Sequence, residues 1–164
     1  QEQGKLDIND NVVDYLPYFK MGDDANKDIE IKQVMSHIAG MPDVDDYEWE
    51  NPQFDENALE RFIKSIGNLK MLWKPGKKFQ YSNIGYEILG DVIAKVSGLT
   101  FEEYINQKIF RVLGMNDSTM LTFERDKDEN EKSVILGFFF RAFSLWCRCD
   151  HFHRNGKRFL ARGL

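Results

Sequence analysis

The stretch Phe79-Gln80-Tyr81-Ser82-Asn83-Ile84-Gly85-Tyr86 decides how this sequence is read, because a Tyr-x-Asn triplet stands directly before an amphipathic run. Apolar residues at three- and four-residue spacing form one face of a helix. The run keeps that spacing from Ile84 to Val96, and Ser97-Gly98 closes it. We therefore expect the triplet at the start of the best helix in the chain, with residues 77–81 as a short extended stretch.

Three other segments carry helix signals. Residues 29–39 have a helical apolar period, and the glycine and proline of residues 40–42 are a conventional stop. Asp55 is expected to cap a helix that runs to Ile66. The capping box Thr100-Phe101-Glu102-Glu103 predicts a helix from Phe101 to about Phe110. The sequence thus predicts a mostly α-helical chain with few short strands.

The composition limits the partners. With 164 residues and 42% hydrophobic residues the chain can build one domain with a core, and a formal charge of −5 gives no reason to expect nucleic acid. Residues 134–164 differ from the rest, since they carry six of the 22 basic residues and one of the 27 acidic residues. The apolar run in this tail is too short to span a membrane, so no membrane span is expected.

The tail also holds a group of soft ligands, Cys147, Cys149, His151 and His153. Zinc sites usually space a ligand pair by two to four residues, and one residue separates each pair here. No metal site is expected, although metal or membrane binding by the basic tail stays open as one functional hypothesis. The polar start, Gln1-Glu2-Gln3-Gly4-Lys5, lacks an initiator Met, and we expect the sequence to begin inside a longer protein.

Four segments in order resemble the β-lactamase-related serine hydrolases, which include class C β-lactamases, penicillin-binding proteins, D-alanyl-D-alanine carboxypeptidases and esterases. Residues 4–17 resemble the family's GKL-LDD-V-YLP segment, and residues 29–42, IEIKQVMSHIAGMP, resemble ITIRQLLSHTSGLP. Residues 75–86 are similar to PG--F-YSN-GY, and residues 113–119 to PLGM-DT, with Val112 in place of the usual proline. The resemblance covers residues 1 to about 120.

The resemblance implies a mechanism with three motifs around one cleft: Ser-x-x-Lys, Tyr-x-Asn, and Lys-Thr-Gly or a histidine-containing equivalent. It assigns Tyr81 as general acid/base and Asn83 as substrate-binding, while Ser82 is the variable middle position. No serine of this sequence has a lysine three residues on, and no Lys-Thr-Gly occurs. The nucleophile is therefore expected about one helix before Gln1. No cofactor is implied, and the partner is a small-molecule acyl substrate of the intact parent.

The resemblance also implies an α+β parent fold, in which a helical part is inserted into an antiparallel sheet. Residues 1–133 would form mainly that helical part and leave an apolar face uncovered. For residues 134–164 we hypothesise a change of reading frame, because a shifted frame of the tail permits a family-like string. His37 is expected to be structural, a partly positive imidazole at a helix C-terminus.

Two interpretations, one enzymatic and one not, remain beside the tail hypothesis. The first is a fragment of a serine hydrolase that acts on β-lactam, D-amino-acid peptide or ester bonds and is inactive as it stands. The alternative is a non-catalytic binding module on the same scaffold. The resemblance implies a location in the cell envelope, the periplasm or outside the cell.

Overall fold

The computed structural model describes residues 1–22, 24–44, 47, 53 and 55–120, and within these residues the regular structure is helical. The α-helices are α1 (Val12–Tyr15), α2 (Ile31–Met35), α3 (Ala58–Ser65), α4 (Asn83–Ser97) and α5 (Phe101–Ile105). A short 3-10 helix, η1 (Ala25–Asp28), precedes α2, and a second one, η2 (Ile66–Asn68), follows α3. A π-helical turn, η3 (Asn106–Phe110), extends α5.

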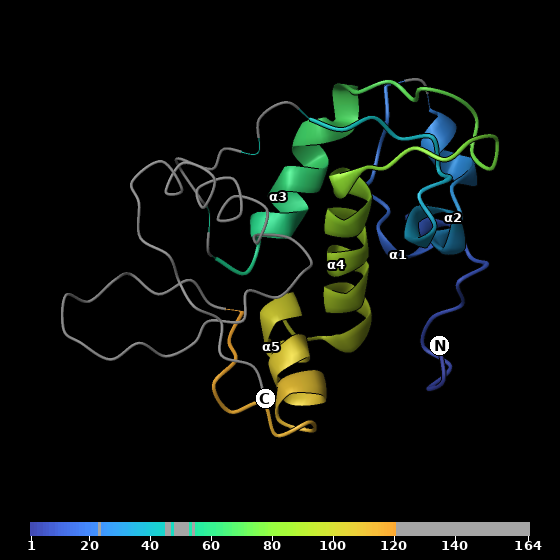
Figure 1. The fold of residues 1–164 in the computed structure, drawn as a ribbon. Coiled ribbons are helices and arrows are strands. Elements are labelled where there is room, and N and C mark those ends of the chain that lie inside the picture. The colour runs from blue at the N-terminus through green and yellow to red at the C-terminus, as the bar shows by residue number, and fades with distance from the viewer. Residues whose placement is uncertain (23, 45–46, 48–52, 54, 121–164) are drawn as a thin grey trace, which may run out of the picture.

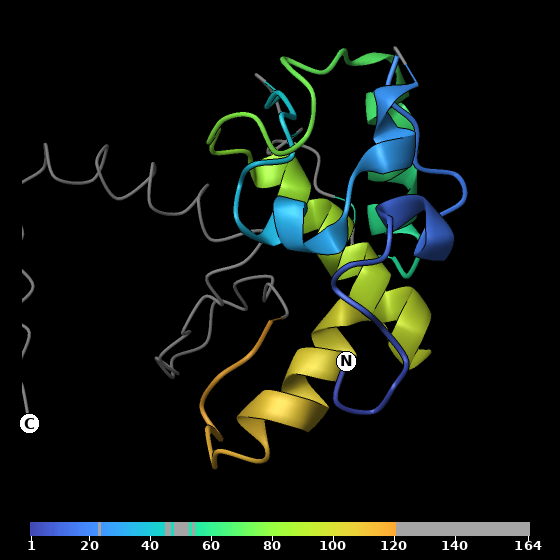
Figure 2. The ribbon, with the colours of Figure 1, turned by 90° about the vertical axis from the view of Figure 1, so that its right-hand side faces the viewer.

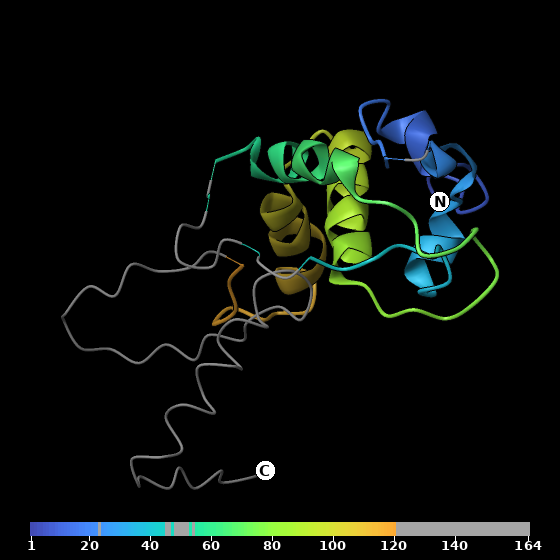
Figure 3. The same ribbon diagram turned by 90° about the horizontal axis from the view of Figure 1, so that it is seen from above.

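Helix α4 organises the fold, because it contacts α1, α2, α3 and α5. In Figure 1 it stands in the middle of the ribbon, and α5 lies beside its C-terminal end, as the turned view in Figure 2 also shows. Seen from above in Figure 3, α1 and α2 lie on one side of α4 and α3 lies on the other. The first turn of α4 lies against α2, since the Cβ position of Gly85 is 3.1 Å from Val34 Cγ1.

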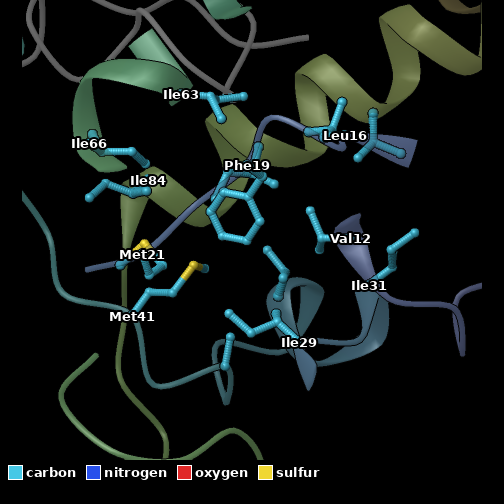
Figure 4. Packing of buried hydrophobic residues seen from close by; sticks show 14 residues of the cluster. Val12, Leu16, Phe19, Met21, Ile29, Ile31, Met41, Ile63, Ile66 and Ile84 are labelled. Carbon is cyan, nitrogen blue, oxygen red and sulfur yellow. The ribbon is translucent and has the colours of Figure 1, made fainter. Parts of the chain in front are cut away.

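The hydrophobic core joins the N-terminal segments to α3 and α4. Fully buried side chains come from α1 and the turn after it, from α2, and from both longer helices (Figure 4), among them Leu16, Phe19, Ile31, Ile63 and Ile84. Burying each such side chain contributes about 1.5–3 kcal/mol. Segments far apart in the sequence thus share one core, which fixes the position of α4 against the N-terminal segments.

Two glycines permit close approaches near the start of α4. A Cβ on Gly85 would lie 3.1 Å from both Met41 Cε and Val34 Cγ1, so the glycine lets α4 lie directly on α2. Gly40 has a φ of +80°, and a Cβ there would lie 2.3 Å from the carbonyl oxygen of Trp73. Gly40 therefore excludes a larger side chain, whereas at Gly85 the Met41 and Val34 side chains would have to shift to admit one.

The predicted helices are found with changed limits. The predicted helix after Tyr81-Ser82-Asn83 is confirmed as α4, and Gly98 ends it with a φ of 72°. The capping box is confirmed, with Glu103 N–H donating to Thr100 Oγ1 at 3.2 Å and Thr100 N–H donating to Glu103 Oε2 at 3.0 Å. The helix predicted over residues 29–39 is shorter, because the chain turns out of α2 at Ser36.

The prediction that Asp55 caps α3 is wrong. The N-cap of α3 is Asn57, and the Asp55 carboxylate instead binds the Arg61 guanidinium at 2.5 Å and accepts the Asn57 N–H. The prediction of short strands is not met in the described residues, where an isolated bridge joins Asn11 to Glu30. Residues 77–81 form no ladder, although Gln80 N–H donates to the His37 carbonyl at 2.7 Å.

Several large apolar side chains are exposed in the described part of the chain. They include Phe79, Val112 and Leu113, which are 67%, 72% and 68% exposed. No helix in the described part of the chain is long and apolar enough to cross a membrane. Residues 134–164 lie outside the described residues. The basic tail, its Cys147–His153 cluster and the hypothesis of a changed reading frame all concern this segment.

Candidate active site

Tyr81 and Asn83 form a hydrogen-bonded pair at the N-terminus of α4. The Tyr81 hydroxyl donates to Asn83 Oδ1 at 2.9 Å. Tyr81 ends the segment that leads into the helix and is 52% exposed, whereas Asn83 is the first helical residue and is half-buried. The structure thus brings the two predicted site residues together, with a phenol presented to solvent rather than packed beneath the helix.

Ser82, between them, is buried and fixes the backbone. Its Oγ donates to the Pro42 carbonyl at 2.8 Å, and its N–H donates to His37 Nδ1 at 3.4 Å. Because the hydroxyl is used in this way, Ser82 does not cap α4 with its side chain. Ser82 is only 2% exposed, so its side chain is not presented to solvent.

His37 lies against the motif tyrosine. Its ring centroid is 4.7 Å from that of Tyr81, 5.0 Å from that of Tyr86 and 5.8 Å from that of Phe79. Burial lowers the pKa of the imidazole, and its Nδ1 accepts the Ser82 N–H, which a cationic ring could not do. Burial and this hydrogen bond both favour the neutral ring, against the expectation of a partly positive imidazole after α2.

Asp43 is the site residue that the sequence did not reveal. Its Oδ2 accepts the Asn83 side-chain Nδ2–H at 2.9 Å and the Asn83 backbone N–H at 3.2 Å. The Tyr47 hydroxyl donates to Oδ1 of the same carboxylate, and burial with this bond raises the pKa of Tyr47. The sequence placed Asp43 in an acidic surface loop, because its partner Asn83 lies far along the chain and no local spacing connects the two.

The arrangement is a chain of hydrogen bonds that runs from a carboxylate through a carboxamide to a phenol. A phenol held in this way can pass a proton to or from a group that approaches its exposed side, and an Asn carboxamide can donate and accept. Among the residues that the structure describes, no three His, Cys, Asp or Glu side chains gather where they could hold a metal ion. The described site therefore offers positioned groups for proton transfer.

Comparisons with known proteins match both the sequence and the fold. The family model for Beta-lactamase matches residues 1–132. Protein flp of Staphylococcus aureus (strain N315) is 31% identical over 136 residues, which are 82% of this chain and 26% of that protein. A penicillin-binding protein from Bacillus halodurans is 30% identical with a TM-score of 0.63, over 80% of this chain and 40% of its own.

A third similar structure is that of EstCE1, a hydrolase with promiscuous acyltransferase activity. It is 27% identical with a TM-score of 0.54, over 69% of this chain and 32% of its own. The chain thus spans about a quarter of the length of the curated relatives that it matches, as the 26% coverage of Protein flp shows.

Proposed function

Because the chain belongs to the Beta-lactamase family, we propose that it is part of a serine hydrolase that transfers acyl groups through a covalent acyl-enzyme. The observation that carries this proposal is the pair Tyr81–Asn83, hydrogen-bonded at 2.9 Å at the N-terminus of α4. The four resembling segments and the family match cover the same part of the chain. Their agreement supports a common origin of this site and the family's second motif.

In this proposal Tyr81 is the general acid/base. A serine hydroxyl is a weak nucleophile until a neighbouring base takes its proton, and the same group can later return that proton to the leaving group. The half-exposed Tyr81 hydroxyl is available for this exchange, since its ring rests on His37 and its oxygen is held by Asn83. Asn83 would bind the substrate amide or carbonyl with its carboxamide.

The nucleophile of the proposed reaction lies outside these 164 residues. No Ser-x-x-Lys occurs in them, and the chain covers 26% of Protein flp. The exposed Phe79, Val112 and Leu113 also fit a helical part that another part of the same fold would cover. The sequence as it stands is then inactive, and its catalytic partners come from the remainder of the parent protein.

Proposed substrates are the acyl compounds that the family shares, namely β-lactams, D-amino-acid peptides and esters. The structure of the penicillin-binding protein and that of EstCE1, a hydrolase with promiscuous acyltransferase activity, resemble this chain at similar identity. Neither likeness favours one substrate over the other. A small-molecule acyl substrate and a location in the cell envelope, the periplasm or outside the cell are proposed on the family resemblance alone.

A second function, a non-catalytic binding module, is favoured by the absence of Ser-x-x-Lys from the sequence. Labelling with a covalent probe separates the two. The chain and a version extended upstream by its own gene sequence are each treated with a fluorescent penicillin and a fluorophosphonate. Labelling of the extended version, but not of this chain, supports the hydrolase. An extended version that contains a folded domain and takes up neither probe supports the binding module.

Residues 134–164 differ from the family in a way that a change of reading frame would explain. The family match ends at residue 132, next to the position where the charge changes sign. A change of reading frame after about this point would explain both features. The nucleotide sequence tests it, since the shifted frame must encode the family's continuation, and a shifted frame without it would end this explanation.

A further inference from the structure

Asp43 contacts the site through two different hydrogen atoms of Asn83. One is the backbone N–H at 3.2 Å and the other a side-chain Nδ2–H at 2.9 Å, and both donate to Asp43 Oδ2. The first N–H groups of a helix have no partner within the helix, and a negative charge near them is favourable. Asp43 therefore supplies the N-terminus of the 15-residue helix α4 with the acceptor that Ser82 does not provide.

The second contact decides which way the Asn83 carboxamide points. With Nδ2 on the carboxylate, Oδ1 faces Tyr81 and accepts its hydroxyl proton at 2.9 Å. Rotating the carboxamide by half a turn would place Oδ1 against Asp43 Oδ2, and two acceptors at that distance repel each other. The carboxylate thus selects one of two orientations that the Asn83 side chain could otherwise adopt.

The segment that leads to Asp43 is held at two points. The Ser82 hydroxyl donates to the Pro42 carbonyl at 2.8 Å, directly before Asp43. Two residues before Pro42, Gly40 lies so close to Trp73 that a Cβ would clash, and the Gly40 carbonyl accepts the Leu72 N–H at 2.9 Å. Asp43 is further bound by the Tyr47 hydroxyl. A carboxylate held in this way can orient its partner without large rearrangement.

We infer that Asp43 is a positioning residue of the active site, which orients the Asn83 carboxamide and through it the Tyr81 hydroxyl for acyl transfer. Asp43 touches neither substrate nor the reacting oxygen in this role. The inference rests on the proposed function for its catalytic part, and on the described contacts alone for its structural part. It adds to the Tyr-x-Asn motif a third member from an earlier segment of the chain.

The structural part is tested on this chain by NMR of the Asn83 side-chain amide. Asp43→Ala removes the acceptor, Asp43→Asn keeps the shape and removes the charge, and Asp28→Asn is the control at an exposed carboxylate of η1. We expect both Asp43 variants to shift the Asn83 Nδ2 proton resonances, to speed their exchange with solvent and to change the Tyr81 ring resonances. The control should leave all three unchanged.

Should Asp43→Ala fail to fold, Asp43→Asn, which keeps the volume of the side chain, gives the same readout. Unchanged Asn83 and Tyr81 resonances in the folded Asp43→Asn variant overturn the inference. So would an equal change in the Asp28→Asn control, because the effect would then reflect charge in general.

The catalytic part is tested on the extended version with a fluorescent penicillin. Asp43→Asn is expected to slow acylation by up to about 100-fold, the effect of a small misplacement of a catalytic group, and to weaken non-covalent binding of the probe, because Asn83 also binds the substrate in the proposed reaction. An extended version that reacts at the same rate with and without Asp43→Asn overturns the positioning role and leaves the hydrolase intact. Failure of the unsubstituted extended version to react overturns the proposed function, whereas the amide signals still test Asp43.

Discussion

The imidazole of His37 and the phenol of Tyr81 pack against each other, with ring centroids 4.7 Å apart and an interplanar angle of 35°. His37 reaches this position because its backbone is left-handed, with a φ of 56°, directly after α2 ends. A non-glycine residue rarely adopts this conformation, and the contacts of its ring with Tyr81 and Tyr86 offset part of the cost. The backbone turn after α2 and the motif tyrosine are thus directly linked.

This link predicts a pH dependence of stability. Burial lowers the pKa of His37 below its ordinary 6.5 in the folded chain, so the unfolded chain binds the proton more tightly. The contribution of His37 is therefore complete above the unfolded pKa and is lost as the pH falls towards the folded pKa. Denaturant unfolding between about pH 5 and 8 should show this loss in the unsubstituted chain.

His37→Gln is the variant that isolates this effect, since the tail histidines remain in both proteins. The difference in unfolding free energy between His37→Gln and the unsubstituted chain should narrow as the pH falls. An NMR titration that gives His37 a pKa at or above its ordinary 6.5 contradicts the account, because the ring would then be stabilised as a cation.

The close approach at Gly40 predicts a large loss of stability on substitution. Gly40→Ala adds a left-handed alanine, which costs about 1–2 kcal/mol, and a clash with Trp73, which costs about 1–3 kcal/mol more. Gly98→Ala is the matched control, because Gly98 has a similar φ of 72° but no atom within 4 Å of its Cβ position. Denaturant unfolding should show the larger loss for Gly40→Ala, and equal losses would contradict the described contact with Trp73.

The buried carboxylate of Asp91 predicts a further measurable effect. Asp91 is 3% exposed, burial raises its pKa, and its Oδ2 accepts the Tyr18 hydroxyl at 2.5 Å. Tyr18→Phe removes the hydroxyl and keeps the ring that Lys64 and Lys95 contact. The unfolding free energy should fall by about 1–3 kcal/mol, the cost of leaving a buried acceptor unsatisfied.

Tyr104→Phe is the control for that experiment, since the Tyr104 hydroxyl makes no hydrogen bond within the described part of the chain. It should change stability by less than Tyr18→Phe does. A Tyr18→Phe variant as stable as the unsubstituted protein would show that Asp91 does not depend on this donor.

Much of the helical framework could be predicted from local patterns. The apolar period from Ile84 to Val96, the closing Gly98 and the box of Thr100 and Glu103 each depend on residues within a few turns, and all three are confirmed. The helix ends were less predictable where a contact with a distant residue or a competing partner determines where the helix begins or ends. Asp55 does not cap α3 because Arg61 binds its carboxylate, and α2 ends early because the chain turns left-handed at His37.

The site was predictable only in its local part. Tyr81 and Asn83 are near neighbours in the sequence, so a motif could identify them, and the structure brings them within hydrogen-bond distance. Asp43 and His37 reach the motif from a distant segment, through the core that places α2 against α4. The environment of His37 was missed for the same reason, since the rings that pack against it belong to Phe79, Tyr81 and Tyr86, which are distant in sequence.

The role of Tyr81 as general acid/base is tested most directly by the rate at which the upstream-extended version is acylated by a fluorescent penicillin or fluorophosphonate. Tyr81→Phe should reduce this rate by about 100- to 10,000-fold, the usual contribution of a positioned acid or base. Tyr86→Phe, which removes a hydroxyl bonded to the Met35 carbonyl in the same aromatic cluster, is the control and should react at nearly the full rate. Equal acylation of the Tyr81→Phe variant and the unsubstituted enzyme would contradict the account.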